Sequence, residues 1–412
     1  MLASTGDLLG QAVRTQVVAT VGLAPLTLVF FQQVSLVGLA ANLVAIPLVT
    51  LVITPLAMLG VAMPLLWQGA SWAVEAMVKV LEALAALPWA QWVTPAAPGW
   101  AMAAGVAGGL LAVLPLPWRH RALAVPLLLP LLLPPVGRPM PGSFDIIAAD
   151  VGQGTAVLVR TARHSLVYDT GPRYSIDSDA GTRVMVPMLR AVGIDRIDLL
   201  VLSHSDTDHV GGADSLLAAW PNTPMLTSLS PNHPLRREHA SHTECRAGQL
   251  WNWDGVSFEV LHPGPDERAP PLRPNQVSCV LKVVSAAIPS RHTALLAGDI
   301  EQGEEARLVA AWRDRPDVLA AELLLVPHHG SKTSSTRAFL DAVSPRVAVF
   351  QHGWHNRFGH PAPEVWARYV ERGIERIGSP ACGAYRWEAG QGRCERDLER
   401  RYWHHRDDGA VP

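Results

Sequence analysis

The first third of the chain is almost free of charge, and this limits its folding options more than any other feature. Only seven residues between Met1 and Gly137 are charged, whereas 30 of the 34 Lys and Arg residues and 33 of the 36 Asp and Glu residues follow. Long stretches of this region have no polar face, so they cannot lie as amphipathic helices on a water-soluble core. We therefore expect residues 1–137 to be embedded in a membrane and the remainder to fold in water.

Four apolar stretches are candidates for membrane helices. The longest exceeds the roughly 20 residues that cross a bilayer, and its prolines are tolerated where neighbouring helices satisfy the freed carbonyl groups. Buried core helices of a soluble protein are the alternative, which the missing polar faces disfavour. The four stretches are Val17–Phe31, Leu36–Leu66, Trp100–Leu116 and Ala122–Val136.

A further segment, Ser71–Trp92, has a different pattern. Glu75, Lys79 and Glu82 are spaced to share one helical face, while Ala, Val, Met and Leu fill the other face and Trp residues flank the segment. Such a helix is typical of the membrane interface, where Trp is enriched. The alternative is a surface helix on a soluble subdomain.

The few charges of the first third also bear on orientation. Arg119 and Arg121 lie between the last two apolar stretches, and positively charged loops favour the cytoplasm. One further crossing then places the residues after Gly137 on the periplasmic face of a multi-pass inner-membrane protein. No cleavable signal peptide is evident at Met1, and we expect the chain to be truncated from a longer membrane protein.

From Phe144 onward, apolar strands alternate with helical segments, which predicts a layered α/β domain over residues 144–390. The residues from 391 to 412 are predicted to form a charged tail that includes His404 and His405, and we expect it to be frayed after Arg396. Strands are predicted at 144–151, 156–161, 165–169, 197–203, 256–262, 277–284, 293–297, 322–327 and 347–351, and helices at 184–192, 211–220, 302–311 and 363–372.

Two histidines and two aspartates crowd into six residues directly after the predicted strand 197–203. They are His204, Asp206, Asp208 and His209. Packing does not explain them, because buried charges without partners are costly. Their nitrogen and oxygen atoms suit a divalent cation such as Zn²⁺, Mn²⁺ or Fe²⁺. A solvated polar loop is the alternative, and the density of ligands favours the metal.

Further candidate ligands follow other predicted strands. Asp299 comes after 293–297, and His328 and His329 come after 322–327. His360 lies shortly beyond 347–351. Side chains at rigid strand ends hold a site better than side chains on free loops. Each feature alone fits a turn or a surface site, but together they predict one convergent site.

These motifs resemble the metallo-β-lactamase superfamily over the range Phe144 to Trp387, which implies an αββα sandwich. That superfamily carries the signature His-x-His-x-Asp-His, then a bridging Asp and a last His ligand, and a structural Asp supports the metal loop. The residues here that match these features in turn are His204, Asp206, Asp208, His209, Asp299, His328 and Asp169.

A narrower resemblance is to the ComEC-type DNA uptake proteins, and it extends into the apolar third. In that family the membrane part forms a channel, and the soluble domain degrades one DNA strand while the other strand passes. The resemblance implies partners: DNA as duplex substrate and single-stranded product, membrane lipid, other competence components and, as an option, a second copy of the chain. The segments that carry it are Asp150–Gly154, His204–His209, Pro327–Ser335, Asn356–Pro361, Gln33–Leu36 and Ala41–Pro47.

The resemblance also implies roles for the site residues. One ion would be held by Asp208, His209, Asp299 and His328, and a second ion by His204, Asp206 and Asp299. Water on the metal would then attack a phosphodiester, with Asp208 serving as both ligand and catalytic residue. The side chains expected to contact phosphate or protonate the leaving oxygen are His329, His360 and Lys332.

Two features depart from the superfamily pattern. Asp206 stands where the superfamily has its second histidine, which hardens the site toward Mn²⁺ or Mg²⁺ rather than Zn²⁺. No clear histidine fills the third motif: His262 is the nearest candidate, and Asn275 and Ser278 occupy the expected region. A catalytically silent DNA-guiding domain is therefore one alternative, and a membrane-anchored hydrolase of another phosphoester is a second.

Two further segments allow local expectations. Residues 330–335 offer amides, hydroxyls and Lys332 ahead of a predicted helix, which suits a phosphate, although an ordinary helix cap is the alternative. Cys382 and Cys394 flank a turn, and a disulfide is an option there if the domain faces an oxidising compartment.

Overall fold

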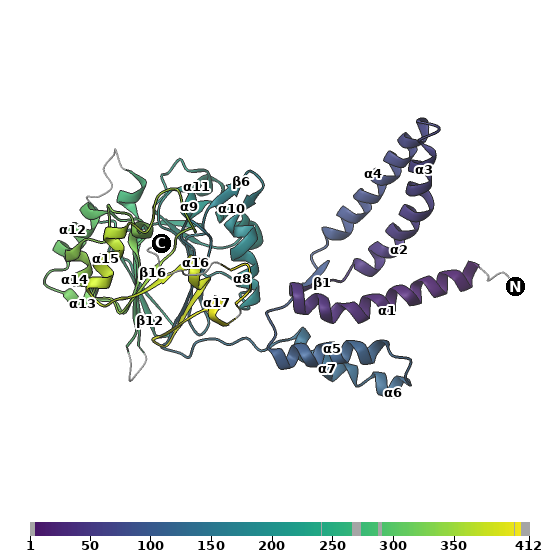
Figure 1. Ribbon diagram of the computed structural model, residues 1–412, viewed down its shortest axis with the longest axis horizontal. Coiled ribbons are helices and arrows are strands. Elements are labelled where there is room, and N and C mark those ends of the chain that lie inside the picture. The colour runs from purple at the N-terminus through teal and green to yellow at the C-terminus, as the bar shows by residue number, and fades with distance from the viewer. Residues whose placement is uncertain (1–4, 240, 266–272, 287–290, 399, 405–412) are drawn as a thin grey trace. The chain divides into compact units, whose positions relative to one another are not determined.

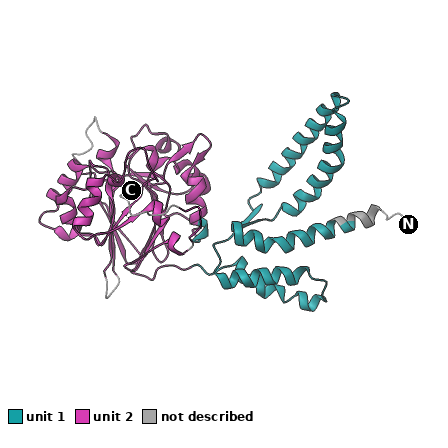
Figure 2. Cartoon of the chain, in the orientation of Figure 1, with its two compact units in different colours: residues 1–136, 190–193 teal, residues 137–189, 194–412 magenta. Residues whose placement is uncertain are grey.

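The computed structural model describes residues 5–239, 241–265, 273–286, 291–398 and 400–404, and the chain divides into two compact units (Figures 1 and 2). Unit 1 comprises residues 1–136 with 190–193, and unit 2 comprises residues 137–189 with 194–412. The expected boundary near residue 137 therefore separates an apolar unit from a charged unit.

Unit 1 is mostly helical. Two of its helical stretches, Val13–Phe31 and Gly38–Leu59, are long and apolar enough to cross a membrane. The bounds are α1 Thr5–Phe31, α2 Gly38–Leu48, the π-helix η1 Val49–Ile53, α3 Thr54–Leu59, α4 Leu65–Ala85, α5 Gly99–Val113, α6 Trp118–Arg121 and α7 Ala124–Leu132, with paired strands β1 Gln33–Ser35 and β2 Gln91–Val93.

Helix α4 differs from the expected helix Ser71–Trp92 at both ends. It begins earlier, at Leu65, and ends at Ala85. Pro88 follows closely, and a proline disfavours helical backbone at the residue before it. The chain beyond Pro88 instead forms β2, in which Trp92 pairs with Val34 of β1.

Small residues let α5 approach its neighbours in unit 1. A Cβ atom added at Gly105 would lie 2.3 Å from the Leu131 side chain of α7, and one at Gly109 would lie 2.5 Å from Pro25 of α1. Close packing at small residues is how helices associate within a membrane, where no hydrophobic force drives them together. These glycines therefore hold α1, α5 and α7 in one group.

Unit 2 contains two large mixed sheets, and four neighbouring strands of each run parallel. The first has the order β10 His242–Glu244, β9 Met225–Thr227, β8 Leu199–Leu202, β5 Ser165–Tyr168, β4 Val157–Arg160, β3 Asp145–Ala148, β18 Tyr385–Glu388 and β19 Gln391–Cys394. The second has the order β11 Leu250–Trp253, β12 Val256–His262, β13 Val280–Ser285, β14 Thr293–Leu296, β15 Leu323–Leu325, β16 Val347–Phe350 and β17 Glu375–Gly378.

The two sheets share one core, and helices cover them from outside (Figure 1). Ile146 and Val159 of the first sheet lie in the same buried cluster as Phe258 and Leu281 of the second, together with Trp387. A separate cluster joins the second sheet to α12 Gln302–Ala311, α13 Pro316–Leu319, α14 Arg337–Val343 and α15 Pro363–Glu371. The expected αββα metallo-β-lactamase fold is thereby confirmed.

Short elements complete unit 2 and lie between its longer strands and helices in the chain. They are β6 Arg173–Ser175, β7 Ser178–Asp179, η2 Gly181–Met185, α8 Val186–Ala191, α9 Thr207–Val210, α10 Ala213–Ala219, α11 Pro234–Glu238, η4 Pro274–Val277, η5 Pro327–Gly330, α16 Ser379–Cys382 and α17 Glu395–Leu398.

The expected tail at 391–412 begins too early. Residues 391–394 form β19, which pairs with β18 across a turn where Ala389 and Gly390 both have positive φ, and α17 follows. A disulfide between Cys382 and Cys394 ties this hairpin to the domain, as the sequence allowed. A second disulfide joins Cys245 to Cys279, 34 residues apart, which the sequence did not predict. Residues 399 and 405–412, including His405, lie outside the described part of the chain.

Candidate metal centre

Three segments bring four candidate ligands together in unit 2. Asp208 and His209 lie on α9, which follows β8 of the first sheet. Asp299 follows β14, and His329 lies in η5 after β15, both from the second sheet. One ligand atom from each of the four lies within 4.8 Å of the others. The cluster therefore forms where strand ends of the two sheets meet.

Asp169 orients His209 within this cluster. Its carboxylate is fully buried and lies 2.7 Å from Nδ1 of His209, and it accepts hydrogen bonds from the backbone amide and the hydroxyl of Ser203, each at 2.7 Å. With Nδ1 held in this way, Nε2 of His209 faces Asp299 Oδ1 at 3.1 Å. A carboxylate that fixes the ring of a ligating histidine is a common outer support of metal sites.

The first part of the metal run forms a second, looser group beside the cluster. His204 is fully buried, and its Nδ1 lies 2.9 Å from the Ser203 hydroxyl. Its Nε2 lies 3.6 Å from Asp206 Oδ2 and 4.0 Å from Asp299 Oδ2. The Asp206 side chain is 45% exposed. Asp299 is thus the residue that both groups share.

The two consecutive histidines of η5 are placed differently from expectation, because His329 rather than His328 lies in the four-residue cluster. Both have positive φ, 49° and 53°, so the backbone turns left-handed and swings the second ring inward. Nδ1 of His329 lies 2.8 Å from the Gln351 carbonyl, and its Nε2 lies 3.2 Å from Asp208 Oδ2. The ring of His328 is 21% exposed, with Nδ1 3.4 Å from Glu301 Oε1 and Nε2 3.8 Å from Asp299 Oδ2.

The cluster fits a divalent cation by the state of its buried nitrogens. The buried Nε2 atoms of His204, His209 and His329 face carboxylate oxygens at 3.6, 3.1 and 3.2 Å, but make no well-aligned hydrogen bond among the described residues. A buried polar atom without a hydrogen bond costs free energy, and bound divalent ions would satisfy these nitrogens. The mixture of imidazole and carboxylate suits Zn²⁺ or Mn²⁺.

Electrostatic coupling within the cluster is strong. Burial alone would lower the pKa of His209, but the charges of Asp299 and Asp169 raise that pKa well above its usual value. Burial would likewise lower the pKa of His329, and Asp299 and Asp208 raise it. Burial would raise the pKa of Asp208, yet the close contact with His329 and the charges of His209 and His329 lower that pKa to about 2. The carboxylates of Asp208 and Asp299 are therefore ionised, and they stabilise positive charge on His209 and His329.

The glycine-rich motif Asp150–Gly154, which precedes β4, supports the metal loop through its backbone. A Cβ atom added at Gly154 would lie 2.3 Å from the Asp208 carbonyl, so only glycine fits this approach. The next amide, of Thr155, donates to that same carbonyl at 3.0 Å. Thr170 donates to the His209 carbonyl through both its amide and its hydroxyl. The motif thus holds the backbone that presents both ligands.

Other expected site residues lie around the cluster. The ring centroid of His360 is 5.6 Å from that of His328 and 6.3 Å from that of His329. Burial first, and then the charge of His329, lowers the pKa of His360 to about 4, so this ring is neutral at pH 7. Lys332 is exposed at the surface.

The expected phosphate site at residues 330–335 is not what the structure shows. The carboxylate of Glu305 on α12 accepts hydrogen bonds from the amides of Ser335 and Thr336, at 2.5 and 2.7 Å. Thr336 caps α14 by accepting from the Phe339 amide. A side chain of the protein therefore takes the place proposed for an anion, and the alternative of a helix cap is correct.

The third-motif region packs against His204. The hydroxyl of Ser278 lies 3.4 Å from His204 Nδ1 and accepts from the Asp299 amide at 3.2 Å. His262 is buried, and its Nδ1 lies 2.7 Å from the Ser278 carbonyl. Asn275 lies in η4 just before this serine. Ser278 therefore supports the cluster, although sequence reasoning assigned it no role.

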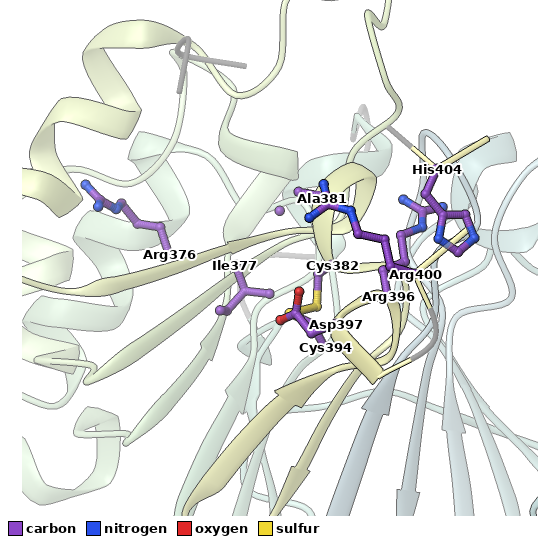
Figure 3. Close-up of a pocket in the computed structure, with 10 residues that line it drawn as sticks. Arg376, Ile377, Ala381, Cys382, Cys394, Arg396, Asp397, Arg400 and His404 are labelled. Atoms are coloured by element: carbon purple, nitrogen blue, oxygen red, sulfur yellow. A yellow bond between two sulfur atoms is a disulfide. The ribbon is translucent and has the colours of Figure 1, made fainter. Parts of the chain in front are cut away.

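A pocket of about 230 Å³ lies elsewhere in unit 2, beside the Cys382–Cys394 disulfide (Figure 3). Arg396 and Arg400 contribute to its lining, and none of the four cluster residues does. The Arg396 guanidinium already contacts the Asp150 carboxylate at 2.7 Å. Chemistry is therefore assigned to the metal cluster and not to this pocket.

Comparison with known proteins agrees with this geometry. Residues 2–119 match the family of competence proteins, and residues 149–281 match the metallo-β-lactamase superfamily. The chain is a relative of the ComEC-type competence proteins. The superfamily of the second domain comprises metal-dependent hydrolases, so a ComEC-type chain with this cluster is expected to bind a divalent cation.

Two relatives align with most of the chain. Competence protein ComA of Neisseria gonorrhoeae is 34% identical over 92% of the chain, which covers 52% of that protein. The uncharacterized protein YcaI of Escherichia coli K12 is 31% identical over 90% of the chain, which covers 47% of that protein. Recombination protein 2 of Haemophilus influenzae is 34% identical over 55% of the chain. The chain spans about half the length of the first two relatives.

We expect Asp169→Asn to lower the affinity for Mn²⁺ or Zn²⁺ by about 10- to 100-fold. The side-chain amide of asparagine carries no negative charge and holds the His209 ring less firmly than the carboxylate does. Metal titration of the full chain in detergent would measure this. Asp254→Asn is the matched control, since Asp254 is also a buried carboxylate that contacts a histidine, His164, at 3.0 Å, but lies outside the cluster. Equal affinities for wild type and Asp169→Asn would contradict the assignment.

Metal affinity should rise as the pH is raised from about 6 through neutrality and above, because ligating histidines must be neutral. The pKa values of His209 and His329 are raised above their usual value in the metal-free protein, so metal binding displaces protons from these rings up to a higher pH than from a free imidazole. Asp208, with a pKa of about 2, is already ionised and releases none. Calorimetry in buffers of different ionisation enthalpy counts these protons, and binding without proton release at pH 7 would refute the coupling.

Proposed function

We propose that unit 2 hydrolyses phosphodiester bonds of DNA with one or two divalent metal ions, while unit 1 belongs to the membrane channel that takes up the other strand. The observation that supports this most is the cluster of Asp208, His209, Asp299 and His329. Its two imidazole Nε2 atoms and that of neighbouring His204 are buried, face carboxylates and make no well-aligned hydrogen bond among the described residues. The relationship to competence proteins supports DNA as the substrate.

The residues divide into ligands and groups that handle the substrate. The four cluster residues would hold one ion, and His204, Asp206 and Asp299 would hold a second. When bound, the metal lowers the pKa of water and offsets the negative charge of the phosphate. His328 borders the cluster with its Nδ1 near Glu301, and we assign it the proton transfer to the leaving oxygen that was first expected of His329.

His360 and Lys332 would contact the phosphate in this scheme. The His360 ring, neutral at pH 7, donates or accepts a hydrogen bond without adding charge to the cluster. The exposed ammonium of Lys332 follows η5 in the chain and supplies a point charge that is free to meet an incoming phosphate. The chain after residue 137 has 30 basic and 33 acidic residues, so the attraction of DNA depends on such local cations.

We further propose that unit 2 faces the periplasm of a cell whose inner membrane holds unit 1. The two disulfides, Cys245–Cys279 and Cys382–Cys394, support this orientation, because disulfides persist in oxidising compartments. The two candidate membrane helices and the competence-protein match support the membrane location. Lipid, other competence components and a second copy of the chain are the proposed partners besides DNA.

Incubation of the full chain in detergent with labelled single- and double-stranded DNA tests the proposal. We expect cutting with Mn²⁺, Mg²⁺ or Zn²⁺ that a chelator stops and that Asp208→Ala reduces by more than about 100-fold, since the variant loses a ligand. Asp214→Ala, an exposed aspartate on α10, serves as the control.

The other outcomes separate the rival functions. DNA binding without cutting in any metal would favour a silent guide. Hydrolysis of other phosphoesters without any action on DNA would favour a different envelope substrate.

A further inference from the structure

The loop from Gly353 to His360, after β16, displays aromatic and cationic side chains beside the metal cluster. Trp354 is 45% exposed and Phe358 is 53% exposed. The Arg357 guanidinium lies 4.8 Å from the centroid of the Phe358 ring. None of the catalytic steps above uses these rings, and exposed apolar side chains grouped beside a site are candidates for a binding surface.

Asn356 gives this loop a fixed shape. Its side-chain oxygen accepts hydrogen bonds from the amides of Phe358 and His360, at 3.2 and 3.0 Å. Its side-chain nitrogen donates to the carbonyls of Gly353 and His360, at 3.1 and 2.5 Å. The rings are therefore presented by a preorganised loop, which lowers the entropy cost of binding a ligand.

A series of rings connects the cluster with the surface. His329 and His360 are stacked with centroids 6.3 Å apart, and His360 and Phe358 are stacked at 5.7 Å, each pair with planes 24° apart. Phe358 is the outermost of the three. A planar group stacked on Phe358 would therefore be separated from His329 of the cluster by the rings of Phe358 and His360.

A second aromatic–arginine pair adjoins the same motif from another side. The Gly353 amide donates to the Gln153 side chain at 3.2 Å, which ties the loop to the glycine-rich motif. The Tyr174 hydroxyl on β6 donates to the Val151 carbonyl of that motif at 2.9 Å. Tyr174 is 44% exposed, and the Arg183 guanidinium lies 5.8 Å from its ring. The second pair is thus linked to the 353–360 loop through the glycine-rich motif.

We propose that Trp354, Arg357 and Phe358, with Tyr174 and Arg183, form a stacking rim that binds the unpaired bases of a single DNA strand next to the bond being cut. Aromatic rings stack on any base, and arginine meets the backbone phosphates or stacks in turn, which gives binding without sequence preference. A small phosphoester has no bases to stack, so the rim selects polynucleotides. This inference rests on the proposed nuclease function and names the strand state that the site accepts.

Affinity for a single-stranded oligonucleotide, measured by fluorescence anisotropy with the full chain in detergent and chelator, tests the rim. We expect Phe358→Ala to weaken binding by about tenfold, and Phe358→Trp to retain it, because tryptophan keeps a stacking face. Arg357→Ala should weaken binding and flatten its salt dependence. Tyr402→Ala removes an aromatic ring that is 93% exposed outside the rim, and it should bind as wild type does.

Kinetics with metal give an independent measure. We expect Phe358→Ala to lower the ratio of kcat/KM on single-stranded DNA to kcat/KM on bis(p-nitrophenyl) phosphate by about tenfold, mainly through KM. Hydrolysis of both substrates with an unchanged ratio, and unchanged DNA affinity of a Trp354→Ala, Phe358→Ala double variant, would overturn the rim and favour a protein partner there. Weaker DNA binding in the variants of a chain that hydrolyses neither substrate would retain the rim and overturn the nuclease.

Discussion

A buried chain of contacts from Asp169 through His209 to Asp299 joins the two sheets, and the site depends on it. Asp169 follows β5 and His209 follows β8 in the first sheet, whereas Asp299 follows β14 in the second. The contacts measure 2.7 and 3.1 Å, and all three side chains are buried. Because each charge here is compensated by its neighbour, the cluster can remain in a dry interior that would otherwise reject it.

The rest of unit 2 serves this junction. Parallel strands align their carboxyl ends, so the residues after β14, β15 and β16 reach the same edge and meet the loop after β8. Gly154 and Thr170 fix the backbone of the metal loop, and Gln351 fixes the ring of His329. Unit 1 has another basis, since its helices α1, α5 and α7 approach one another closely at glycines.

Sequence patterns predicted those parts of the molecule that depend on local periodicity. The apolar strands before His204, Asp299 and His328 were placed correctly because buried parallel strands are continuous apolar runs bounded by turn residues. The uneven distribution of charge, rather than strand periodicity, was the basis for predicting a boundary near residue 137. The helices of unit 1 were located, although Pro88 ended α4 earlier than expected.

The details that failed depend on backbone turns and distant contacts. Two adjacent histidines are equivalent in sequence, and only the left-handed turn of η5 decides that His329 points inward. Glu305 reaches the amides after Ser334 from a helix about 30 residues earlier, and Cys245 meets Cys279 across 34 residues. No local pattern reports such pairings, because they are fixed by how the strands are ordered in space.

Anomalous X-ray diffraction from Mn²⁺-loaded crystals tests the central claim most directly. The account predicts a manganese peak within about 2.0–2.4 Å of ligand atoms from Asp208, His209, Asp299 and His329, with His328 outside the coordination shell. A peak coordinated by His328 in place of His329, or no peak between these side chains, would contradict it.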